Sequence, residues 1–376
     1  MDKRDKFRGC LIGGAAGDAL GYAVEFSSEN KIFAKFGKCG INEYALRGGK
    51  AVVSDDTQMT MFTAAALLNC VTGAKTRGIT SSFEEYIALG YGGWYLTQTK
   101  AFPVDIEGNY ARYSWIMNDP AIFKARAPGN TCLSALSGGK IGTIEAPINN
   151  SKGCGGVMRV APVGLYFANG KHSDTPQTEI DLIGARAAAI THGHELGYIP
   201  AAALVHIVSM LVRHDNISVT DAVASSVVSM RKIFNETDHL RQFHKLMEKA
   251  ASLAVSDISD IDAIHELGEG WVAEETLAIA VYCAVKYQND FEKAICAAVN
   301  HKGDSDSTGA VCGNILGAYL GLSNIPQKFK NELEFYDMLT VLADDLYDDC
   351  IINENGELYD AKWDAKYIKK TYILPD

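Results

Sequence analysis

Two short acidic clusters near opposite ends of the sequence carry the residues best suited to chemistry. They are Ser54-Asp55-Asp56-Thr57 and Gly303-Asp304-Ser305-Asp306-Ser307-Thr308. Each cluster adjoins an apolar run, and carboxylates held together against a core repel one another and lose solvation free energy. Because such clusters persist mainly where cations compensate their charge, the sequence predicts one metal-centred site assembled by folding.

The chemistry of these side chains indicates which cation would bind. Each cluster alone is also typical of a helix N-terminus, where short polar side chains cap the first turn. Two such helix starts facing each other would gather four carboxylates and two hydroxyls, and these hard oxygen ligands favour Mg²⁺ or Mn²⁺ over zinc. Calcium is the nearest competitor, but the regular acidic spacing and terminal glutamate of a calcium-binding helix-loop-helix are missing.

The elements that position these clusters are expected to be helices. Apolar residues recur at helical spacing in six stretches, namely residues 59–68, 183–191, 200–212, 220–234, 276–287 and 309–320. Strict alternation over the length of a strand is hard to find. Ala-rich segments suit closely packed helices, so we predict an all-α fold, a compact bundle without a sheet.

Composition and segment boundaries indicate a single domain. The 376 residues are 47% hydrophobic and 22% charged, as in an ordinary globular protein. The Gly-rich breaks are too short to act as linkers between independent domains. We expect one domain over residues 1–376, with a solvated acidic helix at 336–349 and with 350–376 as a C-terminal tail of uncertain role.

Charge and cysteine usage narrow the functional class. The formal net charge of −11 disfavours a nucleic-acid partner, which usually needs a basic face. The nine cysteines are scattered, without a CxxC pair, and favour reduced structural thiols in a cytoplasmic protein. The first residues are charged, and glycines interrupt the apolar stretch behind them, so neither a signal peptide nor a membrane span is expected there.

Several motifs occur in a specific order along most of the chain. Besides the two acidic clusters they are residues 13–21 with Glu25-Phe26, residues 153–162, Thr191-His192 and residues 270–276. Together these motifs resemble the ADP-ribosylglycohydrolase family. The resemblance implies a compact all-α bundle of the orthogonal type that holds two Mg²⁺ ions, with Mn²⁺ as a possible substitute.

The resemblance also implies a ligand set and a reaction. The metal ligands it implies are Ser54, Asp55, Asp56, Asp304, Asp306 and Ser307. Ser305 would face away, whereas Thr57 and Thr308 would cap or buttress. The substrate would be an ADP-ribosyl group joined to an acceptor through its anomeric carbon, cleaved by an activated water through an oxocarbenium-like transition state. The catalytic candidates are Asp55, Asp56, Asp304 and Glu25, with no division between acid and base.

Further residues are candidates for contact with ADP-ribose. By family position, residues 155–158 (Gly155, Gly156, Val157 and Met158) would cradle the pyrophosphate, since glycines let backbone N–H groups approach an anion. His192 could face the ligand or satisfy the core, and Trp271 could stack on a flat ring or pack internally. Asp18 and Arg159 are expected to support the site from within the fold.

The acceptor on the other side of the bond is less defined. Residues 126–130 resemble a turn of the arginine-specific branch, so ADP-ribosylarginine in a modified protein is the leading substrate. Asp105 and Glu107 could meet a guanidinium, although solvated loop acids are the plainer interpretation. O-linked ADP-ribose on serine or an ester, an ADP-ribosylated nucleobase, and a non-catalytic ADP-ribose-binding module remain the alternatives.

Overall fold

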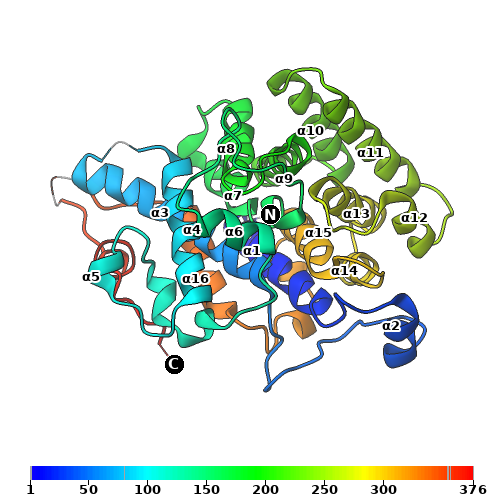
Figure 1. Cartoon of the computed structure of the whole chain (residues 1–376), viewed down its shortest axis with the longest axis horizontal. Helices are drawn as coiled ribbons and strands as arrows, with labels where there is room; N and C mark the ends of the chain where they lie inside the picture. The colour runs from blue at the N-terminus through cyan, green and yellow to red at the C-terminus, as the bar shows by residue number, and fades with distance from the viewer. Residues whose placement is uncertain (1, 80, 354, 356, 376) are drawn as a thin grey trace.

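The computed structural model describes residues 2–79, 81–353, 355 and 357–375, which form helices joined by loops without a β-strand (Figure 1). The α-helices are α1 (Lys3–Gly21), α2 (Glu29–Phe36), α3 (Asp55–Arg77), α4 (Phe83–Thr99), α5 (Ile106–Asn109), α6 (Asn130–Ser137), α7 (Ala161–Ala168), α8 (Gln177–Ala189), α9 (Glu195–Arg213), α10 (Val219–Ile233), α11 (Asp238–Ala254), α12 (Asp260–Leu267), α13 (Ala273–Lys286), α14 (Phe291–Val299), α15 (Ser305–Leu320), α16 (Tyr336–Asp348) and α17 (Ala361–Trp363). The prediction of an all-α fold is confirmed.

Each helical stretch expected from apolar spacing corresponds to one observed helix. Five lie inside α3, α9, α10, α13 and α15, apart from single-residue overruns at the ends of α10 and α13. The sixth stretch, 183–191, extends two residues beyond its helix, because α8 ends at Ala189. There the chain turns, with the Thr191 N–H bonded to the Ala188 carbonyl, and this turn delivers His192 to the candidate site.

The central helix pair, α1 and α15, is joined by a seam of glycines. Gly9, Gly13 and Gly17 on α1 lie against Gly317, Gly313 and Gly309 on α15. A Cβ at Gly17 would lie 2.0 Å from the carbonyl oxygen of Gly309, so the backbones approach closer than any side chain allows. The two helices lie side by side near the middle of the molecule (Figure 1). This seam fixes the end of α1 opposite the start of α15.

Helix α9 is the most apolar long helix and lies in the core. Its length and composition would suit a membrane span, yet 89% of its apolar window is buried inside the fold. It packs against α7, α8 and α10, and together they bury an Ala-rich and Leu-rich interior. A buried helix is hydrophobic on all sides, which accounts for its composition without a membrane.

The C-terminal segment packs onto the fold, and the expectation of a solvated terminal helix and tail is wrong. Helix α16 buries Leu339, Leu342 and Leu346, and Trp363 and Tyr367 beyond it are nearly inaccessible. The three leucines recur every three to four positions, with acidic residues between them. The helix is therefore amphipathic, and its apolar face packs against the rest of the fold. The acidic composition of the stretch obscured that pattern.

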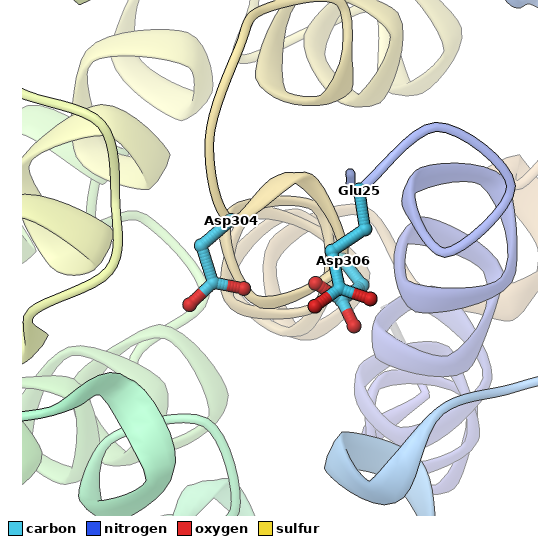
Figure 2. Close-up of side chains that lie close together, drawn as sticks. All are labelled: Glu25, Asp304 and Asp306. Carbon is cyan, nitrogen blue, oxygen red and sulfur yellow. The ribbon is translucent and has the colours of Figure 1, made fainter. Parts of the chain in front are cut away.

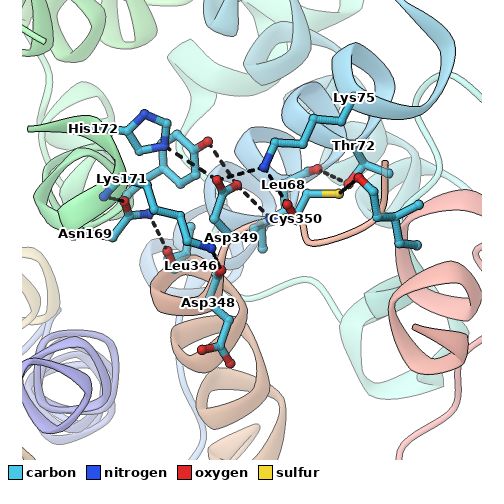
Figure 3. Close-up of polar contacts among 12 residues, drawn as sticks. Leu68, Thr72, Lys75, Asn169, Lys171, His172, Leu346, Asp348, Asp349 and Cys350 are labelled. Atoms are coloured by element: carbon cyan, nitrogen blue, oxygen red, sulfur yellow. Dashed lines mark hydrogen bonds and ion pairs between the residues drawn. The ribbon is translucent and has the colours of Figure 1, made fainter. Parts of the chain in front are cut away.

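The end of α16 is held by a polar junction (Figure 3). The buried Asp349 carboxylate accepts hydrogen bonds from Lys75 at 3.1 Å and from the Tyr166 hydroxyl at 3.2 Å. Lys75 also donates to the Cys350 carbonyl, and Asn169 donates to the Leu346 carbonyl at 3.1 Å. The junction therefore ties α3 and the end of α7 to the C-terminal segment.

Candidate functional site

The starts of α3 and α15 and the turn after α1 meet at one cavity of about 500 Å³. Ser54 is the N-cap of α3, and Asp304 is the N-cap of α15. The cavity is lined by Glu25, Phe26, Asp55, Asp56, Ala127, Pro128, Gly129, Asn130, Thr131, Cys132, Gly153, Cys154, Gly155, Met158, His192, Trp271, Asp304, Asp306 and Ser307. Both acidic clusters thus contribute to one cavity, as the sequence predicted.

Three carboxylates form the tightest group in this cavity. Ligand oxygens of Glu25, Asp304 and Asp306 all lie within 4.8 Å of one another. Glu25 comes from the turn after α1, and its carboxylate lies beside that of Asp306, with Asp304 next to them (Figure 2). All three residues are less than 10% exposed. Asp55 and Asp56 add two further buried carboxylates from the start of α3.

Asp18, at the end of α1, organises the first acidic cluster from behind. Its carboxylate is fully buried and accepts the backbone N–H of Ser54 at 2.9 Å and that of Thr57 at 3.1 Å. The Thr57 hydroxyl donates to it as well. Asp18 therefore supports the site without lining the cavity, which matches its expected structural role.

Several buried carboxylate oxygens in the cavity have no hydrogen-bond partner. They are Glu25 Oε2, Asp56 Oδ2 and Asp304 Oδ2. Burial, followed by the charges of Asp306, Asp55 and Asp18, raises the pKa of Glu25 to about 9. Burial and then the charge of Asp306 raise the pKa values of Asp55, Asp56 and Asp304 well above the usual range. The group cannot be fully ionised without added positive charge.

The donor set fits hard divalent cations. Carboxylates with unpartnered oxygens, grouped within coordination reach, are the arrangement that such ions compensate. Asp55, Asp56, Asp304, Asp306 and the Ser307 hydroxyl line the cavity and would hold the metal, as would Glu25. The Ser54 hydroxyl accepts the Asp56 N–H at 3.2 Å, so it caps α3 and lies just behind the lining residues.

The other supporting residues take the places expected for them. The Ser305 hydroxyl faces away from the cavity, and Thr308 donates to the Ala298 carbonyl at 2.7 Å. Arg159 is fully buried and braces the interior rather than the ligand. Thr308 and Ser305 therefore stabilise the loop that presents Asp304 and Asp306.

The predicted glycine cradle forms one wall of the cavity, but only part of it faces inward. Gly155 and Met158 line the cavity, whereas Gly156 and Val157 lie behind the wall. The N–H groups of Val157 and Met158 donate to the Cys154 carbonyl at 2.9 and 3.2 Å, because the segment coils into a short 3₁₀ turn (Cys154–Gly156). The backbone N–H groups of Val157 and Met158 are therefore already hydrogen-bonded within the turn.

Two exposed aromatic side chains stand at the cavity, one of which the sequence analysis did not assign. Phe26 and Trp271 stack with ring centroids 6.1 Å apart and planes 21° apart, and they are 75% and 41% exposed. Phe26 belongs to the motif that contains Glu25 and was not predicted to line the site. The signal in the sequence that could have identified it is its position directly after Glu25, a candidate site residue.

The acceptor-side candidates separate into two groups. Residues 127–130 of the predicted turn line the cavity, but Arg126 points inward and pairs with Glu334. Asp105 accepts the N–H groups of Glu107 and Gly108 as the cap of α5, and neither acid lines the cavity. Asp105 and Glu107 therefore act as solvated loop acids, the plainer of their two interpretations.

Comparisons with known proteins agree with this architecture. Residues 1–355 match the family described as ADP-ribosylglycohydrolase. The chain is similar to ADP-ribosylhydrolase ARH3 of Bos taurus, with 25% identity over 52% of this chain and 58% of that protein. It thus spans less than two thirds of that relative's length.

Two other matches cover more of the chain. The ADP-ribosyl-[dinitrogen reductase] glycohydrolase of Rhodospirillum rubrum is 25% identical over 88% of this chain and 90% of that protein. A solved structure described as an ADP-ribosylglycohydrolase-related protein complex superposes with a TM-score of 0.60 and 23% identity, over 92% of this chain and 98% of that chain. The structural match shows a shared fold.

Proposed function

Because this chain belongs to the ADP-ribosylglycohydrolase family, we propose that it hydrolyses the glycosidic bond between ADP-ribose and a modified side chain, with two Mg²⁺ ions as cofactor. The observation that carries the proposal is the group formed by Glu25, Asp304 and Asp306. Their buried, partly unpartnered carboxylates lie at a cavity large enough for a nucleotide-sized ligand. The free cysteines favour a cytoplasmic location.

We propose arginine as the acceptor residue in an ADP-ribosylated protein. The support is the turn at 126–130, which resembles the arginine-specific branch and of which residues 127–130 line the cavity. A guanidinium beside several carboxylates would be attracted by their charge and could be bound by two hydrogen bonds. Mn²⁺ would substitute for Mg²⁺, because both prefer oxygen ligands.

The chain's own residues would handle protons and orient the sugar. Bound divalent cations would supply the positive charge that fixes the ribose hydroxyls and acidifies a water. The water oxygen bonds to the anomeric carbon as the glycosidic bond breaks, and the departing nitrogen takes up a proton. Asp56 Oδ2 and Asp304 Oδ2, buried and unpartnered, are suited to accept the proton that the water loses.

A substrate panel tests this proposal. Peptides carrying ADP-ribose on arginine, on serine or through an ester would be incubated with the protein and Mg²⁺, Mn²⁺ or Ca²⁺ in turn, and released ADP-ribose would be measured. We expect release from the arginine peptide with Mg²⁺ and Mn²⁺. Release from no substrate with any metal would reject the enzymatic proposal and leave a non-catalytic ADP-ribose-binding module.

A second candidate keeps the site but changes the bond. The support for arginine is a single turn at the cavity, so O-linked substrates on serine or through an ester are tested on equal terms. Faster release from the serine or ester peptide than from the arginine peptide would select this alternative. The metal requirement would be the same in both cases.

A further inference from the structure

Arg159 lies inside the fold behind the cavity wall. It is fully buried, and its guanidinium lies 4.0 Å from the centre of the Tyr91 ring. Its Nη2 donates to the Thr191 hydroxyl oxygen at 2.7 Å and to the Ala187 carbonyl at 3.2 Å. Because a guanidinium carries only donors, the Thr191 oxygen must be the acceptor in this bond.

The Thr191 hydroxyl is also 2.8 Å from Nδ1 of His192. Its single hydrogen is not used in the bond from Arg159. Among the residues that the structure describes, the competing acceptor beside this hydroxyl is the Cys132 sulfur, which is a weak acceptor and already accepts from Nη1 of Arg159 at 3.4 Å. If Nδ1 carried the histidine proton, the buried hydroxyl hydrogen would have only the weakly accepting Cys132 sulfur as a partner. The hydroxyl therefore donates to Nδ1, and the ring proton is on Nε2.

The Nε2 edge of His192 faces the cavity. His192 is a lining residue, and within the described part of the chain no hydrogen bond is formed by Nε2. A Cβ on Gly153 would lie 3.3 Å from Nε2, and one on Gly155 would lie 3.0 Å from the adjacent Cε1. The two glycines leave this edge of the ring uncovered, so a ligand in the cavity can reach it.

We infer that Arg159 and Thr191 are positioning residues that hold His192 in the tautomer protonated on Nε2, which makes His192 a fixed neutral donor to a phosphoryl oxygen of the bound ADP-ribosyl group. The identity of the acceptor rests on the proposed function, whereas the tautomer rests on the contacts alone. Burial, together with the charge of Arg159, lowers the pKa of His192 to about 3, so the ring stays neutral at working pH. A phosphoryl oxygen only accepts, which matches a donor-only edge.

The tautomer can be measured without any ligand. Nitrogen-15 NMR of the full chain with labelled histidine distinguishes a protonated from an unprotonated ring nitrogen, and His192→Gln identifies the signals of this residue among the nine histidines. We expect protonation on Nε2 in the wild type and in Thr191→Ser, and a shift toward Nδ1 in Thr191→Val. Protonation on Nδ1 in the wild type would overturn the inference, whatever reaction the protein catalyses.

Ligand binding tests the second half of the inference. We expect Thr191→Val to raise the dissociation constant of ADP-ribose and the KM at least fivefold while kcat stays within twofold, and Thr191→Ser to restore the wild-type values. Wild-type affinity in Thr191→Val would overturn the donor role.

Two further experiments distinguish loss of the donor role from unfolding of a variant. Thermal unfolding of each variant shows whether it is folded, and Arg159→Lys provides a second perturbation of the same hydroxyl if Thr191→Val does not fold. If the wild type binds no ADP-ribose, the proposed function and the donor role fall together, while the tautomer measurement still decides the role of Arg159 and Thr191.

Discussion

Arg126 and Glu334 form an ion pair at 2.7 Å, with side chains only 14% and 10% exposed. The second carboxylate oxygen of Glu334 accepts the Val53 N–H at 3.2 Å, and the Arg126 carbonyl accepts the Asp55 N–H at 3.0 Å. The pair therefore holds both the entry to the first acidic cluster and the turn that lines the cavity. Arg126 belongs to the support of the site rather than to acceptor recognition.

Replacing Glu334 should impair both stability and catalysis. Glu334→Gln leaves a buried guanidinium without a charged partner, at a cost of about 3 kcal/mol, and loosens Asp55. We expect kcat to fall roughly tenfold, equivalent to about 1.4 kcal/mol of transition-state stabilisation, with a weaker response to Mg²⁺. Urea unfolding and initial rates measure both effects. Glu332→Gln, at an exposed neighbouring position, is the control. Equal losses of stability and kcat in the two variants would contradict a supporting role of the Arg126–Glu334 ion pair.

Replacing a proposed metal ligand should raise the stability of the metal-free protein and lower its activity. Asp304→Asn removes one charge from a buried group of like charges, so the metal-free variant should melt at a higher temperature than the metal-free wild type. Its turnover should fall by roughly 10³-fold, because several kcal/mol of transition-state stabilisation are lost. Calorimetry and rate measurements test this, with the exposed Asp257→Asn as control. A variant as active as the wild type would refute the metal site.

The stability of the metal-free protein should fall as pH rises. The folded-state pKa of Glu25, about 9, exceeds its ordinary value of 4.5, so the folded protein binds a proton that the unfolded chain releases between these pH values. Stability from this source is complete below about pH 4 and is lost as pH rises through 9. Melting temperatures should therefore drop across this window without metal, and Mg²⁺ should restore more stability at pH 8 than at pH 5.

That pH dependence has a matched control. Glu25→Gln should flatten the decline in the metal-free protein, since the amide does not titrate. An unchanged slope in Glu25→Gln would show that this carboxylate is not the origin of the effect.

The glycine seam should not tolerate even one methyl group. Gly17→Ala places a Cβ against the Gly309 carbonyl and must push α1 away from α15, at a cost of about 3 kcal/mol. Because α1 carries Asp18 and leads into Glu25, Mg²⁺ activation should weaken as well. Gly170→Ala is the control, since a Cβ there meets no atom within 4 Å. Similar melting temperatures for the two variants would argue against the close approach.

The aromatic pair at the cavity should affect binding more than chemistry. Phe26→Ala removes the ring that stacks on Trp271, so we expect KM to rise about tenfold, consistent with the energy of an aromatic contact, while kcat changes little. Ile373→Ala, at a similarly exposed apolar position, is the control. If KM stays at its wild-type value, the pair does not contact the substrate.

The helices and the acidic clusters were predictable because their signals are local. Apolar residues at helical spacing predicted α9 and α15, and Ser54 before Asp55 had the form of a helix cap, which is what the structure shows. The glycines spaced by four in α1 and α15 were also visible in the sequence, although their meeting was not inferred. Local signals were therefore sufficient to predict the helices and the kinds of oxygen-bearing side chains at the site.

The sequence by itself determined an all-α chain with two sets of oxygen-bearing side chains at helix starts, because capping, periodicity and residue chemistry depend on near neighbours. Only the tertiary structure decided that Glu25 lies beside Asp306, that Arg126 turns inward to Glu334, and that Gly155 faces the cavity while Val157 does not. These relationships join segments up to 281 residues apart, such as Val53 and Glu334. Their geometry is set by how closely the helices pack, and no single segment encodes it.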